Sequence, residues 1–363
     1  MGYIYREAAA GCHVVAMPYP VTEEWLSLIG SDPKPDQISF STIPNVVPSE
    51  LVRASNMLEF IEAVMTNMEA PFERFLDHLV QPPAVIIADT FLLWAVRVGN
   101  RKNIPVASFW SMSNSQKICH DLKYSTGSKL KLHGGHHSFS STLTNGLERG
   151  YECADYIPGV SSTSLVDFPS FINGSNPYML GRIVEVFSWV PKEQYLLFPS
   201  IYELEPQAID AIKAGFSFPV YTVGPSIPYS KLEDGSHTIT AFWDVDYLRW
   251  LDDQPSKSIL YISMGSFLSF SSSQMDEIAG GLHDSGVRYL WVARGETSRL
   301  KEGGNWRLVR DFMDLDSNEG KEMRRRVKGF QEICQQAISK DGSSETNIKS
   351  FIREISIGHL SCS

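Results

Sequence analysis

The sequence lacks paired cysteines, long apolar runs and an excess of positive charge. Five cysteines are spread over 363 residues without a Cys-x-x-Cys spacing, which argues against a disulfide framework or a zinc site and for reduced thiols. No apolar run reaches the roughly 18 residues of a membrane-spanning helix. Lys and Arg number 32 against 42 Asp and Glu, a net charge of −10. Nucleic acid and anionic lipid are therefore not expected partners.

The remaining composition is that of a globular chain. Hydrophobic residues make up 43% and charged residues 20% of the sequence, enough to build real cores. The length predicts two or three domains. The first residues, Met1–Arg6, show neither a secretory signal nor a myristoylation motif, so we expect a cytoplasmic protein with no membrane span.

The first two thirds of the chain alternate between apolar strands and amphipathic helices. Helical spacing is found at 56–68, again from Pro71, and from about Phe91 to Val98. The predicted strands are His13–Met17, Val85–Ala88, Pro105–Trp110, Tyr195–Phe198 and Val220–Val223. Such alternation predicts an α/β fold with a parallel, doubly wound sheet that is buried on both faces.

A second α/β unit follows a stretch rich in Pro, Ser, Gly and Asp at about 224–246. We predict strands at Ile259–Ile262 and Tyr289–Ala293. Between them, Ser273–Asp276 is a cap signature for a helix that ends at Gly286. A charged helix is predicted from about Asn318 to Ala337.

Eight short segments occur in an order and at a spacing that match a known family pattern. They are Pro44–Pro48, Ala88–Trp94, Tyr156–Gly159, Tyr202–Glu205, Val223–Pro225, Trp250–Pro255, Tyr261–Phe267 and Gly286–Val292. Together they resemble the plant family 1 UDP-dependent glycosyltransferases, and their sequences are most similar to the 87A subgroup. The resemblance covers the chain from about Cys12 to Ala293 and from about Phe312 to Ile355.

The resemblance implies a GT-B architecture of two Rossmann-like domains, the second truncated here. Residues 1–226 would be the acceptor-binding domain, 227–250 the linker, and 251–363 the UDP-sugar-binding domain with a C-terminal helix. The partners would be a UDP-sugar and a small hydroxylated acceptor, with no metal, no cofactor and no obligate protein partner. In the family a histidine takes the acceptor proton, an aspartate holds its imidazole, and the sugar is transferred with inversion.

Five residues carry the predicted site. Asp89 ends a strand and matches the histidine-orienting aspartate, although a helix cap would also place an Asp there. Gly265 and Ser266 match the loop that faces the donor diphosphate, and an ordinary flexible loop is the simpler alternative. Trp94 and Trp110 are predicted to line the acceptor pocket, and the sequence does not distinguish this position from core packing.

Two parts of the family pattern are missing. Met17–Pro20 runs directly into Val21–Trp25, so neither the Gly-x-Gly-His loop nor its crossover helix fits between them. His13 precedes the strand and does not match the catalytic histidine. In the second domain, no His-Cys-Gly loop or closing Asp-Gln follows Arg294, and Trp306 lacks the flanks of the uracil-stacking Trp.

Two other motifs have plainer explanations. His133–His137 suggests a metal tract or a hydrolase oxyanion loop. It has neither a Gly-x-Ser-x-Gly nucleophile nor a nearby Cys or carboxylate, so we interpret it as solvated loop histidines. Glu322–Arg326 is interpreted as a solvated helix face.

Two functions of different class therefore remain open. The first is a UDP-sugar-dependent glycosyltransferase that acts on a small plant metabolite. The second is a non-catalytic product, either from a mis-spliced or incomplete gene model or as a degenerate small-molecule-binding protein. The missing segments predict that this chain is inactive as it stands.

Overall fold

The computed structural model describes residues 14–17, 43, 46–47, 57–111, 131–132, 135–136, 177–225, 250–251, 253–255, 258–263, 271–292 and 318–360. A parallel five-stranded sheet organises the first part of the chain, in the order β1-β2-β3-β6-β7. Its strands are β1 (Val14–Met17), β2 (Val85–Asp89), β3 (Val106–Phe109), β6 (Tyr195–Phe198) and β7 (Val220–Thr222). The predicted parallel sheet is confirmed, since all four strand pairs run parallel.

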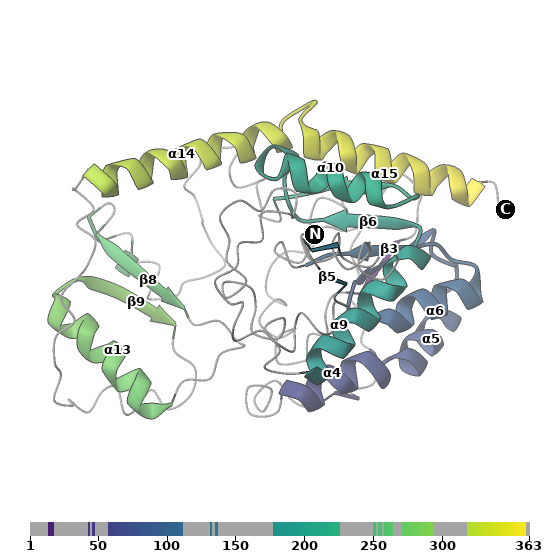
Figure 1. The fold of residues 1–363 in the computed structure, drawn as a ribbon, viewed down its shortest axis with the longest axis horizontal. Coiled ribbons are helices and arrows are strands. Elements are labelled where there is room, and N and C mark those ends of the chain that lie inside the picture. The colour runs from purple at the N-terminus through teal and green to yellow at the C-terminus, as the bar shows by residue number, and fades with distance from the viewer. Residues whose placement is uncertain are drawn as a thin grey trace.

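The two faces of this sheet are covered by different helices, because side chains alternate along a strand. On one face Ile86, Ala88 and Val106 belong to a core with helices α4, α5, α6 and α9. Those helices span Met57–Thr66, Glu69–Asp77, Leu93–Lys102 and Pro177–Trp189. On the other face Val85 and Ile87 meet the last helix of the chain, α15 (Ser343–Leu360), as Figure 1 shows.

Short elements connect the last strands. The 3-10 turn η2 (Val190–Lys192) links α9 to β6, and η3 (Tyr202–Leu204) with α10 (Pro206–Gly215) links β6 to β7. A separate antiparallel pair, β4 (Lys131–Leu132) and β5 (Gly135–His136), includes part of the histidine-rich motif. The histidine side chains of that motif lie outside the described residues.

The second unit is small. Its parallel strands β8 (Ile259–Ser263) and β9 (Arg288–Val292) are joined through α13 (Ser272–Ser285). The predicted strands and the stop at Gly286, which adopts a left-handed conformation with φ 65°, are confirmed. The predicted cap was two residues late, since Ser271 is the N-cap and forms a capping box with Gln274. The box satisfies backbone N–H groups that the first helical turn leaves unpaired.

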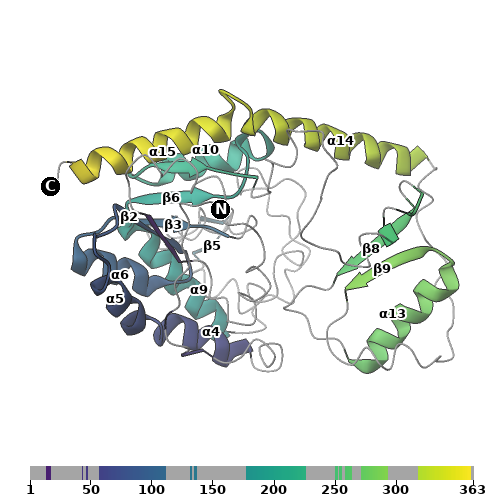
Figure 2. The ribbon, with the colours of Figure 1, turned by 180° about the vertical axis from the view of Figure 1, so that it is seen from behind.

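The last two helices link the units. α14 (Asn318–Ile338) runs from beside the second unit toward the first, and α15 lies along the sheet (Figures 1 and 2). On α15 the Phe351 ring is fully buried, with its centroid 5.3 Å from that of Tyr195 and 5.9 Å from that of Tyr221. Asn347 Nδ2 donates to the Thr222 carbonyl at 3.0 Å. The C-terminal helix was predicted within the 251–363 domain, but its apolar face packs on the first sheet. The domain boundaries themselves stay predictions.

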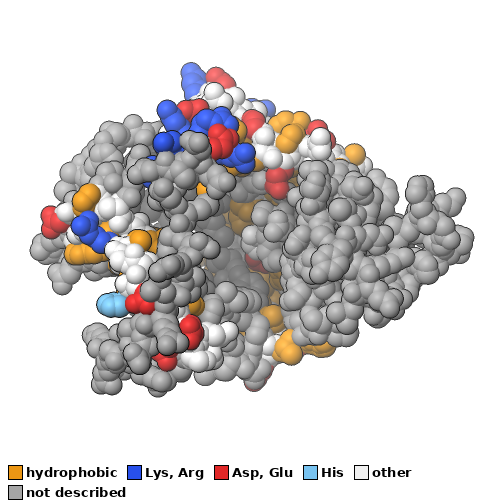
Figure 3. Space-filling view, turned by 60° about the vertical axis from the view of Figure 1, so that its left-hand side comes forward, with side chains coloured by type: hydrophobic (Ala, Val, Ile, Leu, Met, Phe, Trp, Pro, Cys, Tyr) orange, Lys and Arg blue, Asp and Glu red, His pale blue; other side chains and the backbone are white. Residues whose placement is uncertain are grey.

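The basic segment of α14 has the paired charges of a solvated helix face. Glu322 accepts hydrogen bonds from Arg325 at 2.7 and 2.8 Å and from Arg326 at 2.9 Å. These bonds lower the pKa of Glu322 to about 2. In Figure 3 the Lys and Arg side chains gather at the top of the molecule with acidic side chains among them. The interpretation of Glu322–Arg326 as a solvated face is confirmed.

Candidate functional site

Asp89 lies at the carboxyl end of β2, where open α/β sheets place ligands. Both of its carboxylate oxygens accept hydrogen bonds from described residues. The Phe91 backbone N–H donates to Oδ1 at 3.0 Å, and the Ser111 hydroxyl donates to Oδ2 at 2.8 Å. The N-cap of α6 is Leu92, which has no side-chain cap bond. Asp89 therefore forms a local turn with Phe91 rather than capping the helix.

Burial dominates the electrostatics of this carboxyl. Asp89 is only 6% exposed, and desolvation raises its pKa, while the bonds from Phe91 and Ser111 oppose that rise. A buried carboxyl that two donors hold in place can orient a neighbouring polar group or exchange a proton with it. The resemblance predicts only the first of these roles for Asp89, the orientation of a histidine, and that role stays a prediction.

The two tryptophans that were predicted to line the acceptor pocket are buried and contact other residues of the core. Trp94 is fully buried; its indole N–H donates to the Val64 carbonyl at 2.8 Å and its ring centroid lies 5.1 Å from that of Phe72. Trp110 is 3% exposed and lies 6.1 Å from the Phe198 ring, centroid to centroid. Their role in an acceptor pocket stays a prediction.

The predicted donor residues Gly265 and Ser266 lie outside the described residues, as do His13 and Trp306. The structure therefore brings Asp89 and Ser111 together and leaves the donor side of the site as a prediction.

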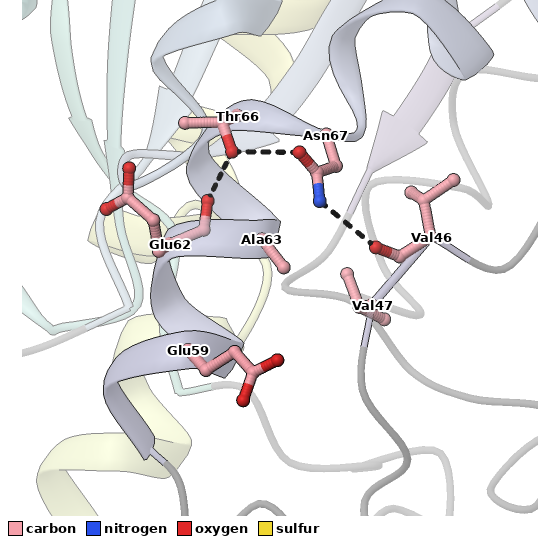
Figure 4. A pocket seen from close by; sticks show the side chains of 7 residues that line it. All are labelled: Val46, Val47, Glu59, Glu62, Ala63, Thr66 and Asn67. Carbon is pink, nitrogen blue, oxygen red and sulfur yellow. Dashed lines mark hydrogen bonds between the residues drawn. The ribbon is translucent and has the colours of Figure 1, made fainter.

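An open groove of about 450 Å³ lies beside α4. Figure 4 shows its seven lining residues, which are Val46, Val47, Glu59, Glu62, Ala63, Thr66 and Asn67. Asn67 Nδ2 donates to the Val46 carbonyl at 3.4 Å and joins the two sides. Glu62 is held by Tyr178 and Arg182 of α9, and the Arg182 hydrogen bond is the largest of the causes that lower the pKa of Glu62. Val46, Val47 and Ala63 are the apolar lining residues and the other four are polar, and in Figure 4 the Glu62 carboxylate points away from Val46 and Val47.

Comparison with known proteins decides the family. UDP-glycosyltransferase 87A1 of Arabidopsis thaliana is 39% identical to this chain over 94% of the chain and 93% of that protein. The chain belongs to the plant UDP-glycosyltransferases. UDP-glycosyltransferase 87A2 of the same plant is 37% identical over 94% of the chain and 96% of that protein. The predicted resemblance to the 87A subgroup is confirmed. No protein-family model matches the chain.

Solved structures give the fold of this glycosyltransferase. The crystal structure of Os79 from O. sativa in complex with UDP superposes with a TM-score of 0.70, at 17% identity, over 94% of this chain and 100% of that one. The fold is GT-B, as predicted. None of the helices among the described residues is long and apolar enough to cross a membrane.

The sequence analysis missed two polar residues, namely Ser111, which contacts Asp89, and the buried Glu193. The register that pairs Asp89 with Phe109 places Ser111 just beyond the same sheet edge, so adjacency of parallel strands could have indicated it. Glu193 follows η2 and is 5% exposed. A Glu beside a Lys and a Gln gives no sequence signal of burial.

Proposed function

We propose that this chain derives from a glycosyltransferase that moves a sugar, most simply glucose, from a UDP-sugar to a hydroxyl of a small plant metabolite with inversion. We further propose that the chain as it stands does not catalyse this transfer, and that the parent reaction uses no metal or cofactor. The observation that supports the first part is the 39% identity to UDP-glycosyltransferase 87A1 over 94% of the chain; Asp89, which the resemblance matches to the histidine-orienting aspartate, is buried at the end of β2 in keeping with it.

Inactivity is supported by what surrounds Asp89. Within the described residues, its two oxygens accept from a backbone N–H and from Ser111, and no imidazole reaches them there. The alignment with UDP-glycosyltransferase 87A1 runs over 425 positions, whereas this chain has 363 residues. That relative therefore carries residues opposite gaps in this chain, in line with the missing histidine loop and donor segment.

The rate consequence follows from the chemistry of the attacking group. A neutral hydroxyl is a weak nucleophile, and losing a positioned general base costs a factor of about 10²–10⁴ in rate. Losing the uracil platform and phosphate loop also removes the binding energy that holds the donor in line for attack. Without the family's histidine, Asp89 would have no imidazole to orient and would not compensate.

A direct transfer assay tests this proposal. The purified chain is incubated with UDP-glucose and a panel of phenolic and terpenoid acceptors, with UDP-glycosyltransferase 87A1 as the matched control. We expect no glucoside above the enzyme-free background. Steady turnover with any acceptor would overturn the inactive assignment.

A test of the second function, binding of a small molecule without turnover, can start from the groove beside α4, which is open and lined mostly by polar residues. Its volume of about 450 Å³ lies within the range of small-molecule sites, about 300–1,000 Å³. The acceptor panel can be titrated by calorimetry against the wild type and Ala63→Trp, which fills the groove. Binding that this variant abolishes supports the second function, and binding that it leaves unchanged contradicts this location.

A further inference from the structure

Thr90 is a buried residue directly after β2 that connects the end of β2 to the end of β3. Its backbone N–H donates to the Phe109 carbonyl at 3.1 Å, and its side-chain hydroxyl donates to the same carbonyl at 3.0 Å. A carbonyl oxygen has two lone pairs and can accept from both donors. Thr90 is only 4% exposed, so water competes little for these bonds.

A second buried hydroxyl, that of Ser108 on β3, contacts Thr90. The two hydroxyl oxygens are 2.7 Å apart. A hydroxyl supplies one proton, and Thr90 uses its proton on the Phe109 carbonyl, so Ser108 is the donor to Thr90. The register explains why they meet, since Ser108 pairs with Ala88. Thr90 comes two residues after Ala88, and alternation along the strand therefore directs it to the same face of the sheet.

The contact between Thr90 and Phe109 lies between the two groups that hold the Asp89 carboxyl. Phe91, which follows Thr90, donates its N–H to Asp89 Oδ1 at 3.0 Å. Ser111, two residues after Phe109, donates its hydroxyl to Oδ2 at 2.8 Å. Each donor is therefore within two residues of one partner in the contact. A shift of Thr90 against Phe109 would move both donors relative to the carboxyl.

We propose that Thr90 is a positioning residue, whose hydroxyl holds the carboxyl ends of β2 and β3 together and thereby keeps both donors within reach of Asp89. The backbone N–H at position 90 would be present with almost any side chain. The hydroxyl adds a second bond to β3 and an acceptor for Ser108. The importance of this role for sugar transfer rests on the proposed function of Asp89, whereas the contacts themselves do not.

Three variants separate the hydroxyl from the packing of the side chain. Thr90→Val has nearly the same shape and no hydroxyl, whereas Thr90→Ser keeps the hydroxyl. Ser108→Ala removes the donor to Thr90 and leaves the bond from Thr90 to Phe109 in place. The readout is the pKa of Asp89, measured by a pH titration of its side-chain carboxyl carbon in NMR. The signal is assigned through its loss in Asp89→Asn.

Displaced donors should raise the pKa of Asp89, because the bonds from Phe91 and Ser111 lower it. We expect a rise of roughly half a unit to one unit in Thr90→Val, the scale of weakened hydrogen bonds to a carboxylate. In Ser108→Ala we expect a smaller rise, since the bond to the Phe109 carbonyl remains. In Thr90→Ser we expect the wild-type pKa, because the hydroxyl is restored.

Hydrogen exchange at the Val223 N–H, which donates to the Phe198 carbonyl at the end of β7, is the control for the fold. It should keep the wild-type rate in every variant. An unchanged Asp89 pKa in Thr90→Val, an equal rise in Thr90→Ser, or a rise accompanied by faster Val223 exchange would overturn the proposal. If Thr90→Val does not fold, Ser108→Ala decides: a rise supports the proposal, and no rise overturns it. None of these measurements uses a sugar donor, so their failure is distinguishable from failure of the proposed function.

Discussion

The Ser111 hydroxyl donates a 2.8 Å hydrogen bond to Oδ2 of Asp89, across the carboxyl ends of two neighbouring parallel strands. Asp89 is buried while Ser111 is exposed, so the bond connects a buried carboxyl to a residue at the surface. In the family pattern the equivalent aspartate holds an imidazole. Here the described partner of Oδ2 is a hydroxyl.

Removing this hydroxyl tests its coupling to Asp89. We expect Ser111→Ala to lower the free energy of unfolding by about 1–2 kcal/mol near neutral pH, because a buried acceptor loses its donor. It should also raise the pKa of Asp89 further, since the Ser111 bond lowers it. Urea unfolding of both single variants and the double variant Ser111→Ala/Asp89→Asn measures the coupling. If the losses in free energy of unfolding of the two single variants simply add in the double variant, the bond contributes nothing to stability.

The raised pKa of Asp89 predicts a pH-dependent effect with a definite sign. A carboxyl whose pKa is raised by folding stabilises the native state below its ordinary pKa, and this contribution is lost as the pH rises through the folded-state pKa. Asn does not titrate, so the Asp89→Asn variant does not lose this contribution as the pH rises. The difference in free energy of unfolding, variant minus wild type, should therefore increase between about pH 4 and about pH 8, by about 1.4 kcal/mol per unit of pKa shift. An equal difference at both pH values would contradict this.

The contact of α15 with the first sheet predicts a large effect far along the sequence. Phe351 is fully buried against Tyr195 and Tyr221, so Phe351→Ala should lower the free energy of unfolding by about 3–5 kcal/mol. Ile357 on the same helix is 60% exposed. Ile357→Ala is therefore the matched control, and we expect it to change the free energy of unfolding by no more than about 0.5 kcal/mol. Chemical denaturation followed by circular dichroism makes the comparison. Similar losses for the two variants would show that α15 does not dock as described.

The missing segments can be restored one at a time. A Gly-x-Gly-His loop of the family pattern is inserted after Pro20, and a donor segment of the family pattern is inserted after Gly304. The donor segment alone should restore UDP binding without turnover, and adding the loop should raise the transfer rate by about 10²–10⁴. Calorimetry and the transfer assay separate the two steps. A folded protein that carries both segments yet binds no UDP would contradict this division.

Local sequence patterns were sufficient for the strands of the two parallel sheets and for several helices, whereas α9 and α10 were not predicted. The apolar run Val85–Ala88 has the length and flanks of a buried strand, and a Gly after an amphipathic stretch ends a helix, as Gly286 does. The position of Asp89 at a strand end, where α/β sheets collect functional groups, could be predicted, whereas its predicted role came from the family resemblance. These inferences depend on a few neighbouring residues.

The remaining features depend on contacts between distant segments. The amphipathic pattern of α15 predicts a buried face but does not say which sheet covers it, and Phe351 in fact meets the first sheet. Glu193 has the sequence context of a surface residue, and its burial follows from the packing of η2 against β3 and β6. The buried contact between the Ser108 and Thr90 hydroxyls depends on the register of β2 and β3, which no local sequence pattern encodes.

Titration of the purified chain with UDP by calorimetry tests most directly whether the donor site is lost. UDP-glycosyltransferase 87A1 under the same conditions is the control. Because the sequence shows no match to the uracil platform and phosphate loop of the family pattern, we predict no saturable heat for this chain. Tight, stoichiometric UDP binding would contradict the proposal that it has lost the donor site.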